Sequence, residues 1–143
     1  MILVAVARVH SIVVTNQLSE IERLSQFVDR VTGQEHLTAD DNANLNLLLD
    51  EIVSNVIRHG FDDAREHRIM VSLAVGDALA TIEVHDDGRP FNPLEAAPPD
   101  FDAPVEDRIG GLGIHIVRSI ARTVGYRREH GRNVLIVTAK LGP

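Results

Sequence analysis

The chain has 143 residues, 44% of them apolar and 24% charged, in a mass of 15.7 kDa, which suits one soluble globular domain spanning residues 1–143. The lack of cysteine excludes a disulfide framework and thiolate metal sites, and it fits a cytoplasmic protein. A net charge of −7, 3% aromatic residues and no tryptophan argue against a nucleic-acid binder, which needs a basic surface with stacking side chains. An acidic protein that binds an anion must use backbone amides, a metal ion or a few placed cations.

The N-terminal part of the chain predicts a strand followed by a helix. Its apolar start lacks the charge order of a signal peptide, and charged residues interrupt it too early for a membrane span. β-branched residues predict a strand over about Ala5–Thr15. A helix follows to about Thr32, with Asn16 or Ser19 as its cap and Gly33 as its end.

The stretch from Asn44 to Gly60 predicts a long amphipathic helix, because its apolar residues recur along one broad face. Glu51, Asn55 and His59 lie four residues apart, so they form a polar stripe at the edge of that face. For this stretch alone, a polar border is the simpler interpretation. A stripe beside the core also suits a helix that forms the wall of a pocket.

The next segments predict a hairpin and a loop. Two strands, Arg68–Val75 and Leu79–His85, flank the turn signal Gly76-Asp77. The segment from Asn92 to Asp107 is rich in proline and acidic residues, which predicts a mobile loop.

The last part of the chain predicts a third helix and a second hairpin. The helix opens at the glycine-rich residues 110–113 and runs to about Val124, where Gly125 stops it. Two further strands are expected over Tyr126–Glu129 and Asn133–Lys140. This order of elements predicts an α/β (α+β) two-layer sandwich, with helices on one face of a mixed sheet.

Polar residues at the ends of these elements suit a nucleotide. A carboxylate at Asp86 can accept a hydrogen bond from an exocyclic amine, which would distinguish adenine from guanine, and Gly88 lets a ligand approach the backbone. An Asp-Gly pair is also common in plain turns. Gly111 and Gly113 offer free amides and a positive helix end to phosphate, although such a pair also occurs in tight loop-to-helix turns.

The stripe on the central helix adds candidates for metal binding and catalysis. Asn55 offers a hard oxygen suited to Mg²⁺. Glu51 could orient or deprotonate a nucleophile beside a terminal phosphate, or it could be a solvated helix carboxylate. The seven histidines are too scattered along the chain to form a metal set.

Together, in this order and spacing, these motifs resemble the GHKL ATPase superfamily, which includes gyrase, Hsp90, histidine kinases and MutL. Glu51-x-x-x-Asn55 is similar to its N box, Asp86-x-Gly88-x-Pro90-Phe91 to its first glycine box, and Gly111-x-Gly113 to its second. The resemblance covers almost the whole chain. The phrases LDEIVSNVIRHGF, DDGRPFNP and GGLGIHIVR resemble the bacterial anti-sigma-factor serine/threonine kinases in particular.

The resemblance implies a Bergerat-type ATP-binding fold, ATP and Mg²⁺, and a homodimer that holds a sigma factor. It implies a protein substrate, an anti-anti-sigma (STAS) domain phosphorylated on serine or threonine. By position it also implies a set of roles: base for Glu51, Mg²⁺ ligand for Asn55, adenine acceptor for Asp86 with the supporting backbone of Gly88, phosphate contacts for Gly111 and Gly113, and a phosphate or partner contact for Arg108.

Two departures and one alternative qualify this resemblance. Pro90 stands where many members of the superfamily have glycine, and the short segment from Asn92 to Asp107 suggests a minimal lid. A histidine kinase would need a dimerisation helix with a phosphoacceptor histidine, and a gyrase-like ATPase would need a transducer domain. The alternative is a module that sequesters a partner in a nucleotide-dependent way without phosphotransfer; the presence of Glu51 favours a kinase.

Overall fold

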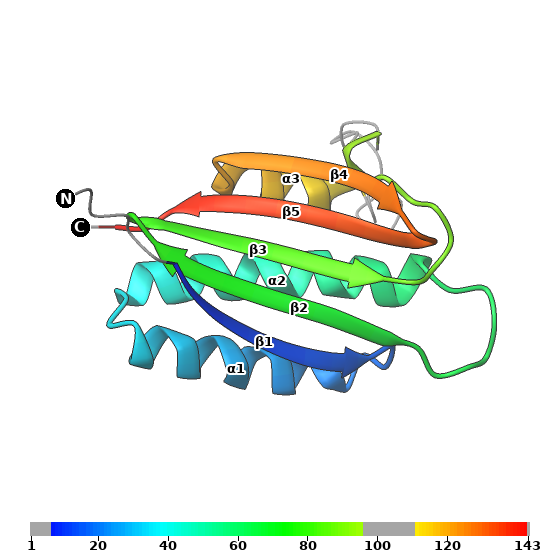
Figure 1. Ribbon diagram of the computed structural model, residues 1–143, viewed down its shortest axis with the longest axis horizontal. Coiled ribbons are helices and arrows are strands. Elements are labelled where there is room, and N and C mark those ends of the chain that lie inside the picture. Colours follow the sequence, from blue (N-terminus) through cyan, green and yellow to red (C-terminus); the bar gives the residue numbers. More distant parts are fainter. Residues whose placement is uncertain (1–6, 96–110, 143) are drawn as a thin grey trace.

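The computed structural model describes residues 7–95 and 111–142. These residues form a five-stranded sheet with three helices on one face, and Figure 1 shows the sheet in front of the helices. The elements in chain order are β1 (Arg8–Thr15), α1 (Glu20–Gln34), α2 (Ala39–His59), β2 (Arg68–Gly76), β3 (Leu79–Asp86), the short 3-10 helix η1 (Pro93–Glu95), α3 (Gly111–Ile120), β4 (Thr123–Glu129) and β5 (Arg132–Lys140).

The strands lie in the order β1-β2-β3-β5-β4, and every neighbouring pair is antiparallel. The predicted two-layer sandwich with helices on one face is therefore confirmed, whereas the predicted mixed sheet is wrong. The reason lies in the connections. The pair α1 and α2 carries the chain away from the end of β1 and back to it, so β2 runs opposite to β1. Between β3 and β4 the described part of the chain forms η1 and α3, and in the sheet β5 lies between these two strands and runs opposite to both.

Helix α2 begins at Ala39, earlier than the predicted Asn44, because Thr38 and Asp41 form a capping box. The Asp41 amide donates to the Thr38 hydroxyl at 3.1 Å, and the Thr38 amide donates to the Asp41 carboxylate at 3.3 Å. The other carboxylate oxygen of Asp41 accepts the amide of Gly142 at 2.9 Å. The segment after β5 thus holds the start of α2.

Two other boundaries differ by a residue or two from the prediction. Helix α1 continues through Gly33 to Gln34, because glycine can occupy a helix without ending it. The first hairpin turns at Asp77 and Ala78, which have φ of 54° and 60°, while Gly76 still pairs within β2. Positive φ at both central residues is the geometry of a tight two-residue hairpin.

The end of α3 was predicted wrongly. The helix stops at Ile120 rather than Val124, and Gly125 does not end it but pairs with Ile136 inside β4. Val124 lies opposite Val137 and packs against the core from the strand. The same β-branched residue suits the inner side of a helix and the inner side of a strand, and the tertiary pairing decided between them.

The core lies between the sheet and the helical layer, in which α2 contacts both α1 and α3. The sheet-facing side chains of α2 are at most 3% exposed: Leu45, Leu48, Leu49, Ile52 and Val53. Burial of each such side chain contributes roughly 1.5–3 kcal/mol. Apolar packing therefore fixes α2, and its flank toward α3 carries the polar stripe.

None of the described helices is long and apolar enough to cross a membrane.

The register between β3 and β5 sets the position of two polar residues. Inward-facing Ala80, Ile82 and Val84 pair with Ala139, Val137 and Leu135, and the next pair in this row is Asp86 with Asn133. Both polar residues are buried, at 4% and 6% exposure. The last inward pair of an apolar row is thus an acid and an amide facing the helices.

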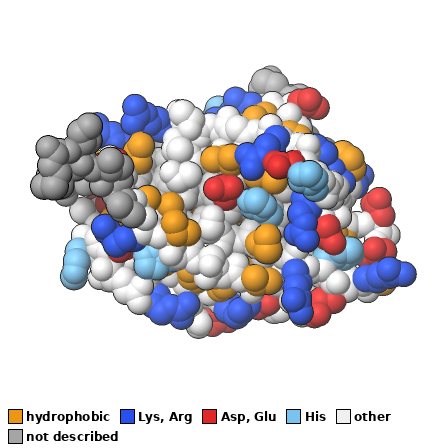
Figure 2. Space-filling model, in the orientation of Figure 1, with side chains coloured by type: hydrophobic (Ala, Val, Ile, Leu, Met, Phe, Trp, Pro, Cys, Tyr) orange, Lys and Arg blue, Asp and Glu red, His pale blue; other side chains and the backbone are white. Residues whose placement is uncertain are grey.

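The opposite face of the sheet is uncovered in Figure 1. Figure 2 shows apolar, charged and histidine side chains interspersed over this face. Its exposed apolar members come from β1 and β2 and include Val9, Val13 and Met70. A pocket lined by residues of α2, α3, β3 and β5 lies on the other side of the sheet, toward the helices.

Candidate functional site

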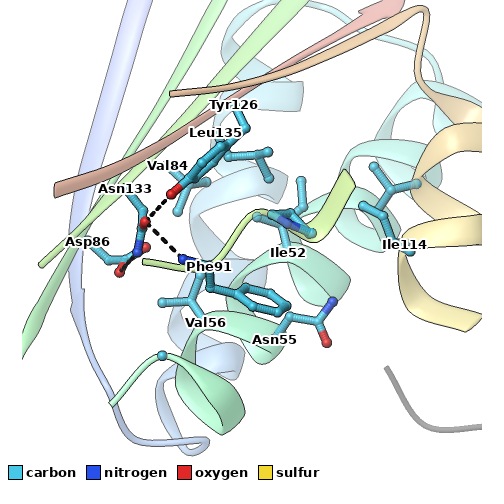
Figure 3. A pocket seen from close by; sticks show the side chains of 13 residues that line it. Ile52, Asn55, Val56, Val84, Asp86, Phe91, Ile114, Tyr126, Asn133 and Leu135 are labelled. Carbon is cyan, nitrogen blue, oxygen red and sulfur yellow. Dashed lines mark hydrogen bonds between the residues drawn. The ribbon is translucent and has the colours of Figure 1, made fainter. Parts of the chain in front are cut away.

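A pocket lies between α2, α3 and the inward-facing ends of β3 and β5 (Figure 3). The space between these elements that no atom fills, including the open mouth, is about 500 Å³. Its lining is mainly apolar with a few polar groups: Ile52, Asn55, Val56, Gly60, Val84, Asp86, Phe91, Pro93, Ile114, Val117, Tyr126, Asn133 and Leu135. Apolar walls with a few placed polar groups are typical of a site for a flat, partly polar ligand.

Asn133 is the centre of the hydrogen bonds at the sheet end of the pocket. Its amide nitrogen donates to Asp86 Oδ1 at 3.0 Å and to the Arg89 carbonyl at 2.8 Å. Its Oδ1 accepts from the Tyr126 hydroxyl at 2.5 Å, the Phe91 amide at 3.3 Å and Arg128 at 3.1 Å. Figure 3 shows three of these bonds converging on one side chain. Every hydrogen-bonding group of this buried amide is therefore satisfied, which fixes its orientation.

Asp86 is buried beside Asn133, and its two carboxylate oxygens are not equivalent. Oδ1 accepts from Asn133 and from the Gly88 amide at 2.9 Å, whereas no hydrogen bond from the described residues reaches Oδ2. Burial raises the pKa of the Asp86 carboxyl above its ordinary value, and the hydrogen bonds from Asn133 and Gly88 oppose this rise. Because Asp86 lines the pocket, Oδ2 is open to a hydrogen bond from a ligand there.

Gly88 lies against the C-terminal end of α2 with no room for a side chain. A Cβ added there would be 2.3 Å from the Gly60 carbonyl oxygen, which is far inside van der Waals contact. The same oxygen accepts the Arg89 amide at 2.8 Å, and Arg89 Nε donates to the His59 carbonyl at 2.7 Å. The turn after β3 is thus joined to the end of α2.

We expect Gly88→Ala to lower the free energy of unfolding by roughly 1–3 kcal/mol, because the added Cβ must push the turn away from the Gly60 carbonyl. Urea denaturation of the two proteins measures this. Gly125→Ala is the matched control, since a Cβ there meets nothing within 4 Å. Equal losses from the two substitutions would contradict the close approach at Gly88.

Glu51 and Asn55 lie at the α3 end of the pocket region. A Cβ added at Gly113 would be 2.7 Å from Glu51 Oε2 and 3.4 Å from Asn55 Nδ2, so both α2 side chains face the first turn of α3. Gly111 is the first residue of that helix. Figure 3 shows Asn55 directed from α2 toward α3. The acid, the amide and the positive end of a helix are thus brought together.

The remaining predicted site residue, Arg108, lies outside the described residues, as does most of the predicted loop. The described start of that loop forms η1, whose Leu94 carbonyl accepts from Arg118 of α3 at 2.9 Å. His59, the last member of the stripe, has its ring 6.4 Å from Phe91. Its buried Nε2 has no hydrogen-bond partner among the described residues.

The described residues contain no group of three or more histidine, aspartate or glutamate side chains arranged to hold a metal ion. The donor set beside Gly113 is one amide and one carboxylate, Asn55 and Glu51. Mg²⁺ commonly binds through one or two oxygen ligands from the protein together with water and substrate phosphates. Asn55 therefore suits an ion that arrives with a phosphate ligand, with its amide oxygen as the protein's contribution.

Sequence reasoning missed Asn133, Tyr126 and Arg128. One signal was present: Asn133 begins an alternation with Leu135 and Val137, in which a polar residue occupies a position of the inward-facing row. That alternation does not reveal the partner across the strands. Only the register of β3 with β5 places this amide opposite Asp86.

Comparison with known proteins agrees with this geometry. Residues 14–139 match the family model of the histidine kinase-like ATPase domain. The serine/threonine-protein kinase BtrW of Bordetella bronchiseptica is 23% identical over 118 residues, which are 82% of this chain and 83% of that protein. The anti-sigma F factor of Bacillus subtilis is 26% identical over 83 residues, which are 57% of each chain.

Solved structures show the same fold. The histidine kinase domain from the blue-light activated histidine kinase of Erythrobacter litoralis matches with a TM-score of 0.55 and 15% identity, covering 87% of this chain and 60% of that one. The histidine kinase AdeS of Acinetobacter baumannii matches with a TM-score of 0.50 and 14% identity, covering 95% of this chain and 70% of that one. This chain therefore spans less than two thirds of the Erythrobacter domain, as it does of the anti-sigma F factor.

Proposed function

The chain belongs to the histidine kinase-like ATPase family, and on that premise we propose that it is a serine/threonine protein kinase that uses ATP and Mg²⁺. Family membership makes it an ATP-using domain distantly related to the anti-sigma factor kinases. The observation that carries the finer proposal is the juxtaposition of Glu51 with the first turn of α3, one helical turn before Asn55 of the pocket lining.

We assign the sheet end of the pocket to adenine. The 6-amino group of adenine would donate to Asp86 Oδ2, while Asn133 and Gly88 hold Oδ1. The apolar walls formed by Ile52, Val84 and other side chains would enclose the faces of the base. Guanine has a carbonyl where adenine has its amine, so it would place an acceptor against an acceptor.

We expect Asp86→Asn to weaken ATP binding by roughly 1.5–3 kcal/mol, the contribution of one charge-assisted hydrogen bond. The same substitution should stabilise the nucleotide-free protein at neutral pH. The pKa of Asp86 is raised, so ionisation of this buried carboxyl costs folding free energy once the pH exceeds its folded pKa. Calorimetry with ATP and GTP, together with urea denaturation, measures both effects. Equal affinity of the wild type for ATP and GTP would exclude the adenine assignment.

We assign the α3 end of the pocket to the phosphates. Amides of Gly111 and Gly113 begin a helix whose first turn carries no acidic side chain, which favours an anion there. Arg108 is proposed as a further phosphate or partner contact. Asn55 would supply the protein ligand to Mg²⁺, which neutralises phosphate charge when it is bound.

Glu51 is proposed as the general base for transfer to a protein hydroxyl. Its carboxylate would take the proton as the hydroxyl oxygen forms a bond to the γ-phosphorus and the bond from that phosphorus to the β-γ bridging oxygen breaks. ADP leaves, and the phosphoryl group stays on the serine or threonine. The half-buried Glu51 already lies beside Gly113, where the terminal phosphate is placed by this assignment.

The proposed partners follow from the relatives. One is a serine/threonine-protein kinase and another an anti-sigma factor. We propose that this chain acts as a cytoplasmic homodimer that binds a sigma factor and phosphorylates a STAS-type anti-anti-sigma protein. The test is incubation with γ-labelled ATP, Mg²⁺ and STAS proteins encoded near its gene. Label on a STAS serine or threonine supports the kinase, whereas tight ATP-dependent capture of a partner without transfer would favour the sequestering module.

A further inference from the structure

His67 lies between two carboxylates at the end of the loop that follows α2. Its Nε2 is 2.6 Å from Asp63 Oδ1, and its Nδ1 is 3.0 Å from Asp87 Oδ1. The ring stacks on Phe61 with centroids 4.3 Å apart and planes tilted by 16°, and its side chain is 15% exposed. The His67 amide also donates to the Asn16 side chain at 2.9 Å. The two contacts of the ring nitrogens, the hydrogen bond from the backbone amide and the stacking on Phe61 therefore hold this side chain in one orientation.

The two carboxylates determine the protonation state of the ring. Ionised carboxylates only accept hydrogen bonds, so both ring nitrogens must carry protons to satisfy both contacts. The charged groups facing this cluster are Asp63 and Arg65 from the same loop and Asp87 from the turn after β3. The hydrogen bond to Asp63 is the main cause that raises the pKa of His67, and the bond to Asp87 adds to it.

The contact with Asp87 joins the turn after β3 to the loop that follows α2. Asp87 lies between Asp86 and Gly88, which form the adenine end of the proposed site. Residues 61–67 directly follow Gly60, whose carbonyl accepts the Arg89 amide at 2.8 Å. The turn after β3 is thus fastened to the end of α2 on one side by backbone bonds and on the other by His67.

We propose that His67 is a positioning residue for the pocket: its imidazolium joins the loop of residues 61–67 to Asp87 and so holds the turn that carries Asp86 and Gly88. When the ring loses a proton, the remaining one stays on Nε2, whose contact with Asp63 is the shorter at 2.6 Å; Nδ1 then faces Asp87 as an acceptor, and the contact with Asp87 is lost. A raised folded pKa means that this link is fully present below about pH 6.5 and is lost as the pH rises through the folded pKa. Nucleotide affinity should weaken over the same interval, a consequence that rests on the proposed function.

The experiment compares ADP affinity of the full chain, its His67→Gln variant and its Asp87→Asn variant across pH. At about pH 6 we expect either variant to bind ADP about 5-fold or more weakly than the wild type, and at about pH 8.5 the ratio should approach one. The ratio cancels the titration of the ADP phosphates, which is common to all the proteins. The double variant should bind no more weakly than either single one, because both remove the same contact. His130→Gln is the control, since that side chain is 89% exposed and faces Glu129 of its own hairpin rather than Asp87.

Two outcomes would overturn the proposal: a variant-to-wild-type ratio that does not change with pH, or losses that multiply in the double variant. A readout without nucleotide separates this proposal from the proposed function. Nuclear magnetic resonance of the histidine rings should show His67 titrating above the ordinary histidine range in the wild type and returning toward it in Asp87→Asn and Asp63→Asn. A wild type that binds no ADP while His67 titrates high would overturn the proposed function and leave the link between His67 and Asp87 standing. An ordinary His67 titration would overturn that link.

Discussion

Replacing Glu51 by glutamine is expected to lower phosphoryl transfer by about 10²–10⁴-fold while ATP affinity stays nearly unchanged. Glutamine keeps the size of the side chain beside Gly113 but cannot take a proton from the attacking hydroxyl. Asn55→Ala should behave differently, because it removes the proposed Mg²⁺ ligand and so weakens Mg²⁺-dependent nucleotide binding as well as transfer. The measurement pairs calorimetric ATP titration with single-turnover phosphorylation of a STAS partner.

The matched control for this experiment is Asp50→Asn. Asp50 is the neighbouring acid on the same helix, but it is exposed and lies in the groove between α1 and α2, where its carboxylate accepts from Ser54 at 3.4 Å. Its substitution should leave transfer within about 2-fold of the wild-type rate. Phosphorylation by Glu51→Gln at the wild-type rate would show that the base assignment is wrong, even with ATP bound in the pocket.

Replacing Asn133 by leucine is expected to lower the free energy of unfolding by about 3 kcal/mol and to reduce ATP affinity below detection by calorimetry. Leucine fills a similar volume but leaves Asp86 Oδ1 without its side-chain donor and the Arg89 carbonyl without its donor. It also frees the donors of Tyr126 and Arg128. Tyr126→Phe removes only one donor from the same oxygen and should cost about 1 kcal/mol.

The pH dependence of the stability lost in Asn133→Leu shows whether the loss comes from packing or from ionised Asp86. Because Asn133 lowers the pKa of Asp86 against the effect of burial, its removal should raise that pKa further. A carboxyl with a raised folded pKa destabilises the fold above that pKa and not below its unfolded pKa. The loss caused by Asn133→Leu should therefore shrink as the pH falls below about 4. An equal loss at neutral and acidic pH would point to packing alone and contradict the role assigned to the buried carboxylate.

The sequence predicted those parts of the site that depend on neighbours along the chain. Glu51 and Asn55 share a flank of one helix, and Asp86 and Gly88 share one turn, so spacing alone places each pair. One member of each pair, Asn55 and Asp86, lines the same pocket. That the two pairs belong to one site was expected from the family resemblance and not from any local pattern.

Residues that depend on pairing between distant segments could not be found in this way. Asn133 meets Asp86 only through the β3–β5 register, and His67 meets Asp87 only because the loop after α2 folds against the turn after β3. The misplaced end of α3 has the same origin, since Val124 has an apolar side chain that suits either a helix or a strand. The capping box at Thr38 was readable in the sequence, but its aspartate is less common at that position than glutamate.

The position of β5 in the sheet has a consequence for how the protein folds. β5 lies between β3 and β4, and Gly142, two residues after its end, hydrogen-bonds to Asp41 at the start of α2. During synthesis on the ribosome, the pocket cannot close until β5 and Gly142 have emerged, because β5 supplies part of its wall and Gly142 anchors its central helix. Folding must then await contacts between segments about a hundred residues apart, with loop closure entropy opposing them, so we expect slow formation of the native state and a collapsed intermediate with β3 exposed along one edge.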